Sequence, residues 1–253
     1  HVGAEVHARA PRVSAELPAT GERFEGLLPP VVAGPAFAIR KPAVAVFTLA
    51  DYVAAGIMSP GQADVLRQAV AERRNILVAG GTSTGKTTLT NALLAEVARS
   101  GDRVVLIEDT RELQCAAPNL VALRTKDGIV SLSDLVRSSL RLRPDRIPIG
   151  EVRGAEALDL LKAWSTGHPG GIGTIHAGTA IAALWRLEQL IPEAVGTVPR
   201  ALIAATIDVI AVLAGRGSAR RLSELAHVTG LGSTGDYDLF PAIPTPDPTG
   251  ASQ

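Results

Sequence analysis

The chain has 253 residues, of which 46% are hydrophobic and 20% are charged, and its formal net charge is zero. This length suits one large domain with a smaller companion, and the neutral charge without a polybasic tail argues against nucleic acid as the main partner. No apolar run approaches the roughly 18 residues of a membrane-spanning helix, and the single cysteine, Cys115, excludes a disulfide framework and favours a reducing compartment.

The first stretch of the chain differs from the rest. Apolar residues are spread among charged ones, and prolines stand at positions 11, 18, 29, 30 and 35, which predicts short antiparallel strands and turns. The stretch is too small for a core of its own, and the chain begins with His1 rather than Met. We therefore expect a fragment in which residues 1–40 are the C-terminal part of a β-rich N-terminal domain, followed by a linker and first helix over residues 41–58.

Strands and helices alternate over residues 59–240, which predicts an α/β domain with a mainly parallel sheet covered on both faces. Ser59-Pro60-Gly61-Gln62 has the pattern of a helix start, with Ser59 as N-cap and Gln62 at the third position. The apolar patterns place strands at 75–79, 103–107, 120–125, 147–150, 171–176 and 209–213, and helices at 88–97, 133–142 (capped by Ser133-Asp134), 155–166, 181–190 and from 197 on. Residues 222–228 and 237–240 are expected to form a closing hairpin, and the proline-rich residues 241–253 a disordered tail.

The segment Gly80-Gly81-Thr82-Ser83-Thr84-Gly85-Lys86-Thr87 fits the phosphate-binding pattern G-x-x-x-x-G-K-[ST] without a mismatch. It lies between a predicted buried strand and a predicted helix, which is the context that the pattern needs. The glycines allow successive N–H groups to face phosphate oxygens at the positive end of a helix. Lys86 is expected to reach the β- and γ-phosphates, Thr87 to complete the shell of a Mg²⁺ ion, and Thr88 to join the nucleotide-binding residues.

Carboxylates follow a predicted buried strand at Glu108, Asp109 and Glu112. Sites in parallel α/β sheets lie beyond the carboxyl ends of the strands. Near a nucleotide, these side chains could therefore hold Mg²⁺ directly or through water. The alternative is a solvated loop after a strand.

A second apolar strand ends in Gly150-Glu151. A carboxylate at this point can orient and deprotonate the water that attacks a γ-phosphate. Arg146 or Arg153 could neutralise charge in the transition state, whereas the alternative is a surface ion pair between Glu151 and Arg153. Pro148 lies inside this strand, and because proline lacks an N–H donor, we expect an edge position or a bend there.

Two histidines, His168 and His176, flank a glycine-rich predicted strand. At a strand end, His176 could sense the γ-phosphate or a neighbouring subunit, and the alternative is a structural histidine. The spacing of the two histidines does not suit zinc, and one cysteine cannot supply the missing ligands.

These four segments resemble, in order and spacing from residue 75 to residue 176, the Walker A, Asp-box, Walker B and His-box motifs of the type II/type IV secretion ATPase family. The segments 47–53, 141–146 and 151–157 are similar in detail to the conjugal-transfer ATPases of the TrbB kind. The resemblance covers the chain from about residue 21 to residue 240.

The resemblance implies a RecA-like P-loop ATPase domain behind a smaller N-terminal domain, assembled as a hexameric ring at the cytoplasmic face of the inner membrane. Such a ring hydrolyses ATP with Mg²⁺ and acts with inner-membrane components of a conjugation or type IV secretion apparatus. It also implies roles for particular residues. Glu151, Lys86 and His176 belong to the catalytic set, to which the charge argument above adds Arg153. Thr87, Glu108 and Glu112 hold the metal, and Arg40 or Arg23 reaches the nucleotide from the N-terminal side.

Two further functions stay open from the sequence. A nucleic-acid-stimulated motor of RecA or helicase type shares the core fold, but it needs a basic or aromatic surface, and only 3% of the residues are aromatic. A nucleotide-binding scaffold without significant turnover is compatible with Pro148 and with an incomplete first domain. A small-molecule kinase would need an acceptor site that the four motifs do not provide.

Overall fold

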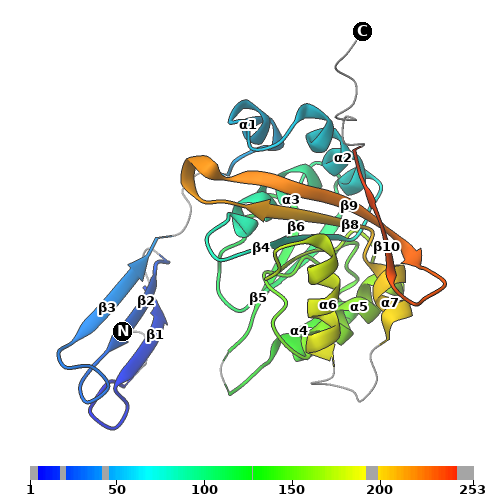
Figure 1. Cartoon of the computed structure of the whole chain (residues 1–253). Helices are drawn as coiled ribbons and strands as arrows, with labels where there is room; N and C mark the ends of the chain where they lie inside the picture. The colour runs from blue at the N-terminus through cyan, green and yellow to red at the C-terminus, as the bar shows by residue number, and fades with distance from the viewer. Residues whose placement is uncertain (1–4, 18–20, 42–45, 127, 192–198, 244–253) are drawn as a thin grey trace. The chain divides into compact units, whose positions relative to one another are not determined.

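The computed structural model describes residues 5–17, 21–41, 46–126, 128–191 and 199–243 (Figure 1). The chain divides into two compact units, His1–Ala45 and Val46–Gln253. Most of the predicted tail, from residue 244 on, lies outside the described residues, and Pro241 is the last residue of a strand.

The smaller unit contains an antiparallel sheet of three short strands, as the proline and charge pattern predicts. The strands are β1 (Arg12–Glu16), β2 (Arg23–Leu27) and β3 (Ala36–Arg40), in the order β1-β2-β3. The rings of Phe24 and Phe37 stack on the neighbouring strands β2 and β3 with centroids 6.0 Å apart. Phe37 is nevertheless 70% exposed, so the pair joins two strands of the small sheet without forming a buried core.

Two capped helices open the larger unit. Helix α1 (Leu49–Ala54) begins at a capping box between Thr48 and Asp51. Helix α2 (Pro60–Ala71) begins at a capping box between Ser59 and Gln62, which confirms the helix start predicted from the sequence. In both boxes the N-cap hydroxyl accepts a backbone N–H of the first turn, and the third residue's side chain accepts the N-cap N–H in return.

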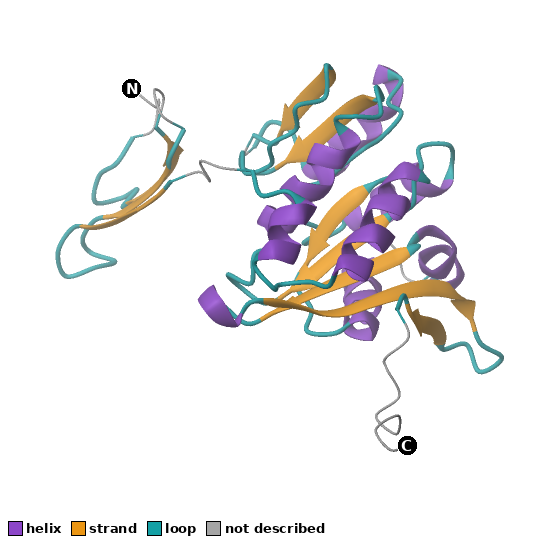
Figure 2. Ribbon diagram, turned by 90° about the horizontal axis from the view of Figure 1, so that it is seen from above, coloured by secondary structure: helices purple, strands orange, loops and turns teal. Residues whose placement is uncertain are grey.

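The centre of the larger unit is a mixed sheet with a parallel middle, shown in Figures 1 and 2. Strands β4 (Ile76–Gly80), β7 (Ile172–Ile175) and β8 (Val209–Ala214) are parallel, and β9 (Arg221–Leu231) and β10 (Tyr237–Pro241) extend the sheet antiparallel, in the order β10-β9-β8-β4-β7. A parallel pair, β5 (Arg103–Glu108) and β6 (Asn119–Arg124), lies beyond β7. The predicted α/β class, with its parallel strands and closing hairpin, is confirmed.

The strand predicted over residues 147–150 is irregular, and it bridges β5 and β7 through isolated pairings. On the side that faces β5, the N–H groups of Arg146 and Gly150 donate to β5 carbonyls, and Pro148 between them has no N–H to donate. On the other side, the Ile149 N–H donates to β7. The proline therefore costs one ladder bond within the sheet, and Glu151 still follows at the same edge as the ends of β5 and β7.

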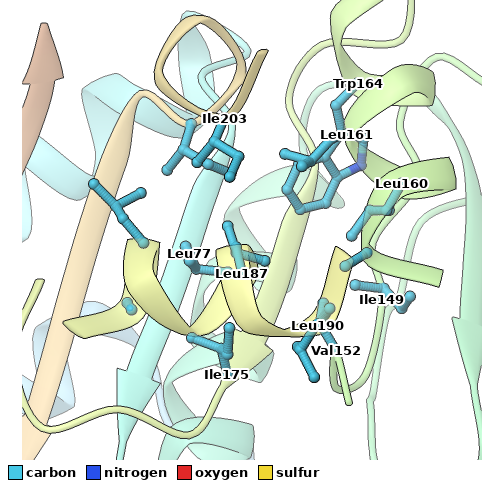
Figure 3. Close-up of a cluster of buried hydrophobic side chains, with 14 of the residues drawn as sticks. Leu77, Ile149, Val152, Leu160, Leu161, Trp164, Ile175, Leu187, Leu190 and Ile203 are labelled. Atoms are coloured by element: carbon cyan, nitrogen blue, oxygen red, sulfur yellow. The ribbon is translucent and has the colours of Figure 1, made fainter. Parts of the chain in front are cut away.

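The two faces of the sheet carry two separate cores. Along β4, Ile76 and Val78 belong to one cluster of buried side chains and Leu77 and Ala79 to the other, as the alternation of a strand requires. The first cluster packs under α1, α2 and α3 (Lys86–Val97). The second, seen in Figure 3, packs under α4 (Leu132–Ser139), α5 (Glu156–Ser165), α6 (Ala180–Leu190) and α7 (Arg200–Thr206).

The start of α4 corrects one sequence prediction. Ser131, rather than Ser133-Asp134, is the N-cap, and it forms a capping box with Asp134. The helix ends at Ser139 and continues as a 3₁₀ turn over Leu140–Leu142. Within the described ranges, no helix is long and apolar enough to cross a membrane.

Close packing of Trp164 on β7 makes Gly171 a sensitive position. A Cβ atom on Gly171 would lie 2.0 Å from Cε2 of Trp164, whose indole N–H donates to the Ile147 carbonyl at 3.0 Å. We expect Gly171→Ala to lower the free energy of unfolding by about 3 kcal/mol, because the buried ring has to move. Urea unfolding measures the change. Gly178→Ala, where a Cβ meets nothing within 4 Å, is the matched control, and equal stabilities of the two variants would contradict the prediction.

Candidate active site

Four polar segments meet at one edge of the sheet. The phosphate loop follows β4, the acidic segment follows β5, Glu151 follows the irregular segment between β5 and β7, and His176 follows β7. These strands run parallel, so their carboxyl ends lie together. The four segments predicted from the sequence therefore lie side by side.

Lys86 lies folded into the loop that precedes it. Gly85 stands at the N-cap of α3 with φ +99°, a conformation that glycine adopts without strain, and no side chain caps this helix end. The Lys86 ammonium donates to the carbonyls of Gly80 and Gly81 at 2.9 and 3.0 Å, and its Nζ lies 3.5 Å from Nδ1 of His176. Burial lowers the pKa of Lys86 from its ordinary value, whereas the nearby Glu151 opposes this shift.

The acidic segment contacts the start of α3 through Glu112. The Thr87 hydroxyl donates to the Glu112 carboxylate at 3.2 Å. Glu108 instead turns inward, where its Oε1 accepts the backbone N–H groups of Glu112 and Leu113 at 2.9 and 2.7 Å. Burial raises the pKa of Glu108. Of the two predicted acidic metal ligands, Glu112 thus lies at the Thr87 hydroxyl, and Glu108 holds the segment that carries Glu112.

Asn91, which sequence reasoning did not select, ties the acidic segment to α3. Its side chain is buried, donates to the Glu112 carbonyl at 3.3 Å and accepts the Gln114 N–H at 2.8 Å. The signal in the sequence is an amide on the face of α3 one turn beyond Thr87. Taken alone, that signal does not distinguish this role from an ordinary polar position.

Glu151 lies between two basic side chains. Its carboxylate contacts the Arg153 guanidinium at 2.5 Å and Nε2 of His176 at 3.0 Å. Arg153 also lies 3.9 Å from the Asp109 carboxylate. The ion pair between Glu151 and Arg153, the plainer alternative from the sequence, is therefore present, but it lies beside Lys86 and His176 and not on a distant surface.

The hydrogen bonds of His176 define its neutral tautomer. Burial and the adjacent Lys86 ammonium lower the pKa of His176, although Glu151 opposes them. A neutral ring that donates from Nε2 to Glu151 keeps the lone pair of Nδ1 for the Lys86 ammonium. His176 thus connects the lysine of the loop with the carboxylate of the neighbouring segment.

This arrangement predicts the titration of His176. Protonation would place a second positive charge beside Lys86, so we expect the NMR midpoint of its ring signals to lie below the ordinary histidine pKa of 6.5. Lys86→Ala should raise the midpoint, because it removes the repelling charge. A midpoint at or above 6.5 in the unchanged protein would contradict the geometry. A lowered pKa also means that His176 contributes stability above pH 6.5 that is lost as the pH falls.

Comparison with known proteins agrees with the geometry. The model of the family described as type II/IV secretion system protein matches residues 11–222. The chain belongs to this family. It is 50% identical over 228 residues to the conjugal transfer protein TrbB of Rhizobium radiobacter, across 89% of this chain and 70% of that protein.

Two further similar proteins extend the comparison. The type IV secretion system protein PtlH homolog of Bordetella bronchiseptica is 37% identical in an alignment that covers 87% of this chain and 76% of that protein. The crystal structure of the VirB11 ATPase from the Brucella suis type IV secretion system, in complex with sulphate, superposes with a TM-score of 0.60. It is 31% identical and covers 88% of this chain and 75% of that one.

Arg146 is not part of the site. Of the two arginines that the sequence offered for neutralising transition-state charge, only Arg153 lies at the site. It lies at the opposite ends of the strands, where its Nε donates to Asp102 at 2.5 Å and its Nη2 to the Val70 carbonyl at 2.9 Å. Its side chain is only 2% exposed. Arg146 is a buried partner of Asp102, because a charge so far from water needs a counter-charge.

Arg40 and Arg23 lie in the smaller unit, opposite each other on β3 and β2. Their reach toward the nucleotide site stays a prediction from the resemblance. The phosphate loop has, in contrast, two arginine neighbours within the larger unit, Arg216 and Arg220, which sequence reasoning missed. No sequence signal marks them, since they follow an ordinary apolar strand.

Proposed function

We propose that this chain is an ATP-hydrolysing ring motor that powers a conjugation or type IV secretion apparatus. The observation that carries the proposal is the meeting of Lys86, Thr87, Glu112, Glu151 and His176 at one sheet edge, in a chain of the type II/IV secretion family. Two of the similar proteins support it, since the Brucella suis VirB11 protein is named an ATPase and the TrbB relative is named a conjugal transfer protein.

Residues 80–88 would bind the phosphates of ATP through backbone N–H groups at the start of α3. Lys86 would then turn its ammonium from the carbonyls of Gly80 and Gly81 to the β- and γ-phosphates. The Thr87 hydroxyl and the Glu112 carboxylate, already 3.2 Å apart, fit Mg²⁺, which uses few protein oxygens and keeps water and phosphate ligands. Bound Mg²⁺ would neutralise phosphate charge. The Glu108 carboxylate would keep Glu112 in position by accepting the backbone N–H of Glu112.

Glu151 would orient and deprotonate the attacking water. Its two partners, Arg153 and His176, fix the carboxylate in place, since they contact different oxygens of it. Arg153 lies beside Glu151 and could neutralise charge on the phosphoryl group as it is transferred. Its pKa is raised mainly by the hydrogen bond to Glu151, so it stays charged throughout.

The ring would be a hexamer at the cytoplasmic face of the inner membrane, where it would act with inner-membrane components of the machine. Residues 59–240 would be the RecA-like motor domain, and residues 1–40 part of the N-terminal domain. That domain would supply Arg40, or Arg23, to a nucleotide across the linker. This division rests on the family resemblance and on the two compact units of the chain.

Assembly is expected to control turnover, because a ring can complete a site that one chain leaves open. We expect ATP hydrolysis per subunit to fall at least about tenfold on dilution below the assembly concentration. Light scattering with and without Mg-ATP measures the assembly in the same samples. Constant hydrolysis per subunit across the dissociation range would contradict a ring-dependent motor. Strong stimulation by single-stranded DNA that falls with salt would instead favour a nucleic-acid motor.

A further inference from the structure

The turn between β8 and β9 lies against the phosphate loop. It is a tight turn over residues 215–220, in which Gly215 has φ +75° and a Cβ on it would lie 2.0 Å from the Ala219 carbonyl oxygen. The end of β8 also touches the loop, since a Cβ on Gly80 would lie 2.8 Å from the Leu213 carbonyl oxygen. The turn between β8 and β9 is therefore tightly folded and lies close to the phosphate loop.

Two arginines of this turn contact the loop. The Nε of Arg216 donates to the Thr82 carbonyl at 3.1 Å, which leaves its terminal N–H groups for other acceptors. The guanidinium of Arg220 lies against Gly85 so closely that a Cβ there would be 2.9 Å from its Nε. The Nε of Arg220 is buried and has no hydrogen-bond acceptor, and buried donors are seldom left so.

No carboxylate neutralises this pair within the part of the chain that the structure describes, where neither guanidinium forms a salt bridge. The acidic side chains of the site come from the β5 and β7 side of β4, and the two arginines come from the β8 side. Tyr52 lies near Arg220, but burial raises the pKa of its hydroxyl to about 12, so it supplies no negative charge. The β8 side of the loop thus carries unmatched positive charge.

We propose that Arg220 and Arg216 are ligands of the bound nucleotide's phosphate groups, supplied by the same chain that supplies the loop. An anionic phosphate oxygen is the acceptor that the buried Nε of Arg220 lacks, and a guanidinium fork suits such an oxygen. The two arginines would hold the phosphate chain from the side opposite Glu112 and Glu151. This inference rests on the proposed function, because it assumes that the loop binds a nucleotide.

Equilibrium binding of a fluorescent ATP analogue with Mg²⁺, followed at fixed salt, tests the proposal without requiring turnover. Arg220→Ala is expected to weaken binding about tenfold, Arg216→Ala about threefold, and the double variant more than either, since each charge-assisted hydrogen bond adds affinity. Arg221→Ala is the matched control, because it removes the same charge from the next, exposed position and should bind like the unchanged protein.

A melting curve without nucleotide separates binding from structure. If Arg220 acts as a ligand, Arg220→Ala should keep the melting temperature of the nucleotide-free protein, because the Nε donor has no partner to lose. Only the rise in melting temperature that Mg-ATP produces should become smaller. Unchanged affinity in both alanine variants would overturn the proposal. If Arg220→Ala does not fold, Arg220→Lys takes its place, with about threefold weaker binding expected and native affinity overturning the proposal. If the unchanged protein binds the ATP analogue no better than Lys86→Ala does, the result would instead overturn the proposed function.

Discussion

Lys86→Ala is expected to abolish ATP hydrolysis and to weaken nucleotide binding by about 100-fold. Lys86 is the only charged residue in the sequence of the proposed phosphate loop, residues 80–88, and its ammonium donates to the carbonyls of Gly80 and Gly81. A 100-fold loss corresponds to about 2.7 kcal/mol of binding free energy, within the range for a buried charge-assisted contact. Titration with a fluorescent ATP analogue and phosphate release measure the two losses.

The control for this variant is Lys162→Ala, which removes an equal charge from an exposed position on α5. It should bind and hydrolyse like the unchanged protein. Because Lys86 also connects two carbonyls of the loop, a melting curve accompanies the assay. Hydrolysis within tenfold of the unchanged protein by a folded Lys86→Ala variant would show that the loop is not the catalytic phosphate site.

Glu151→Gln should separate binding from chemistry. The amide keeps the size of the side chain and can still contact Arg153, but it cannot accept a proton from water. We expect the nucleotide affinity to change by less than about threefold and the turnover number to fall by about 100- to 1,000-fold, the usual contribution of a general base. Single-turnover hydrolysis and equilibrium binding, measured on the same preparation, give the two numbers.

Glu72→Gln is the matched control for Glu151→Gln, since Glu72 is an exposed carboxylate at the end of α2. It should leave both affinity and turnover unchanged. Turnover by Glu151→Gln close to that of the unchanged protein would remove Glu151 from the role of base. Lost affinity together with lost turnover would make Glu151 part of the binding site instead.

Local patterns predicted the elements of the larger unit well where a short-range interaction fixes them. The start of α2 follows from the reciprocal bonds of Ser59 and Gln62, which lie within one helical turn. The start of α4 was predicted at the wrong residue, although its signal is also local. Ser131 forms reciprocal bonds with Asp134 three residues later, whereas the prediction took Ser133-Asp134 as the cap.

Pro148 shows what the sequence leaves open in a strand. The sequence shows that one donor is missing, but it does not show which neighbour loses the bond. The structure places that gap on the β5 side, between two N–H groups that do reach β5. The irregular segment is held in the sheet by the bonds around the proline, so Glu151 keeps its place at the edge.

The sequence by itself determined the class of the fold and the edge at which the polar segments gather, because apolar runs, caps and the glycine loop are local signals and parallel strands end at one edge. Only the tertiary structure decided which charged groups meet there. Arg153 and Arg146 are close neighbours in the chain, yet one contacts Glu151 and the other is buried beside Asp102 at the far end of the strands. Arg216 and Arg220 reach the loop from a distant part of the chain. Such contacts depend on strand order and on packing, which no short stretch of sequence contains.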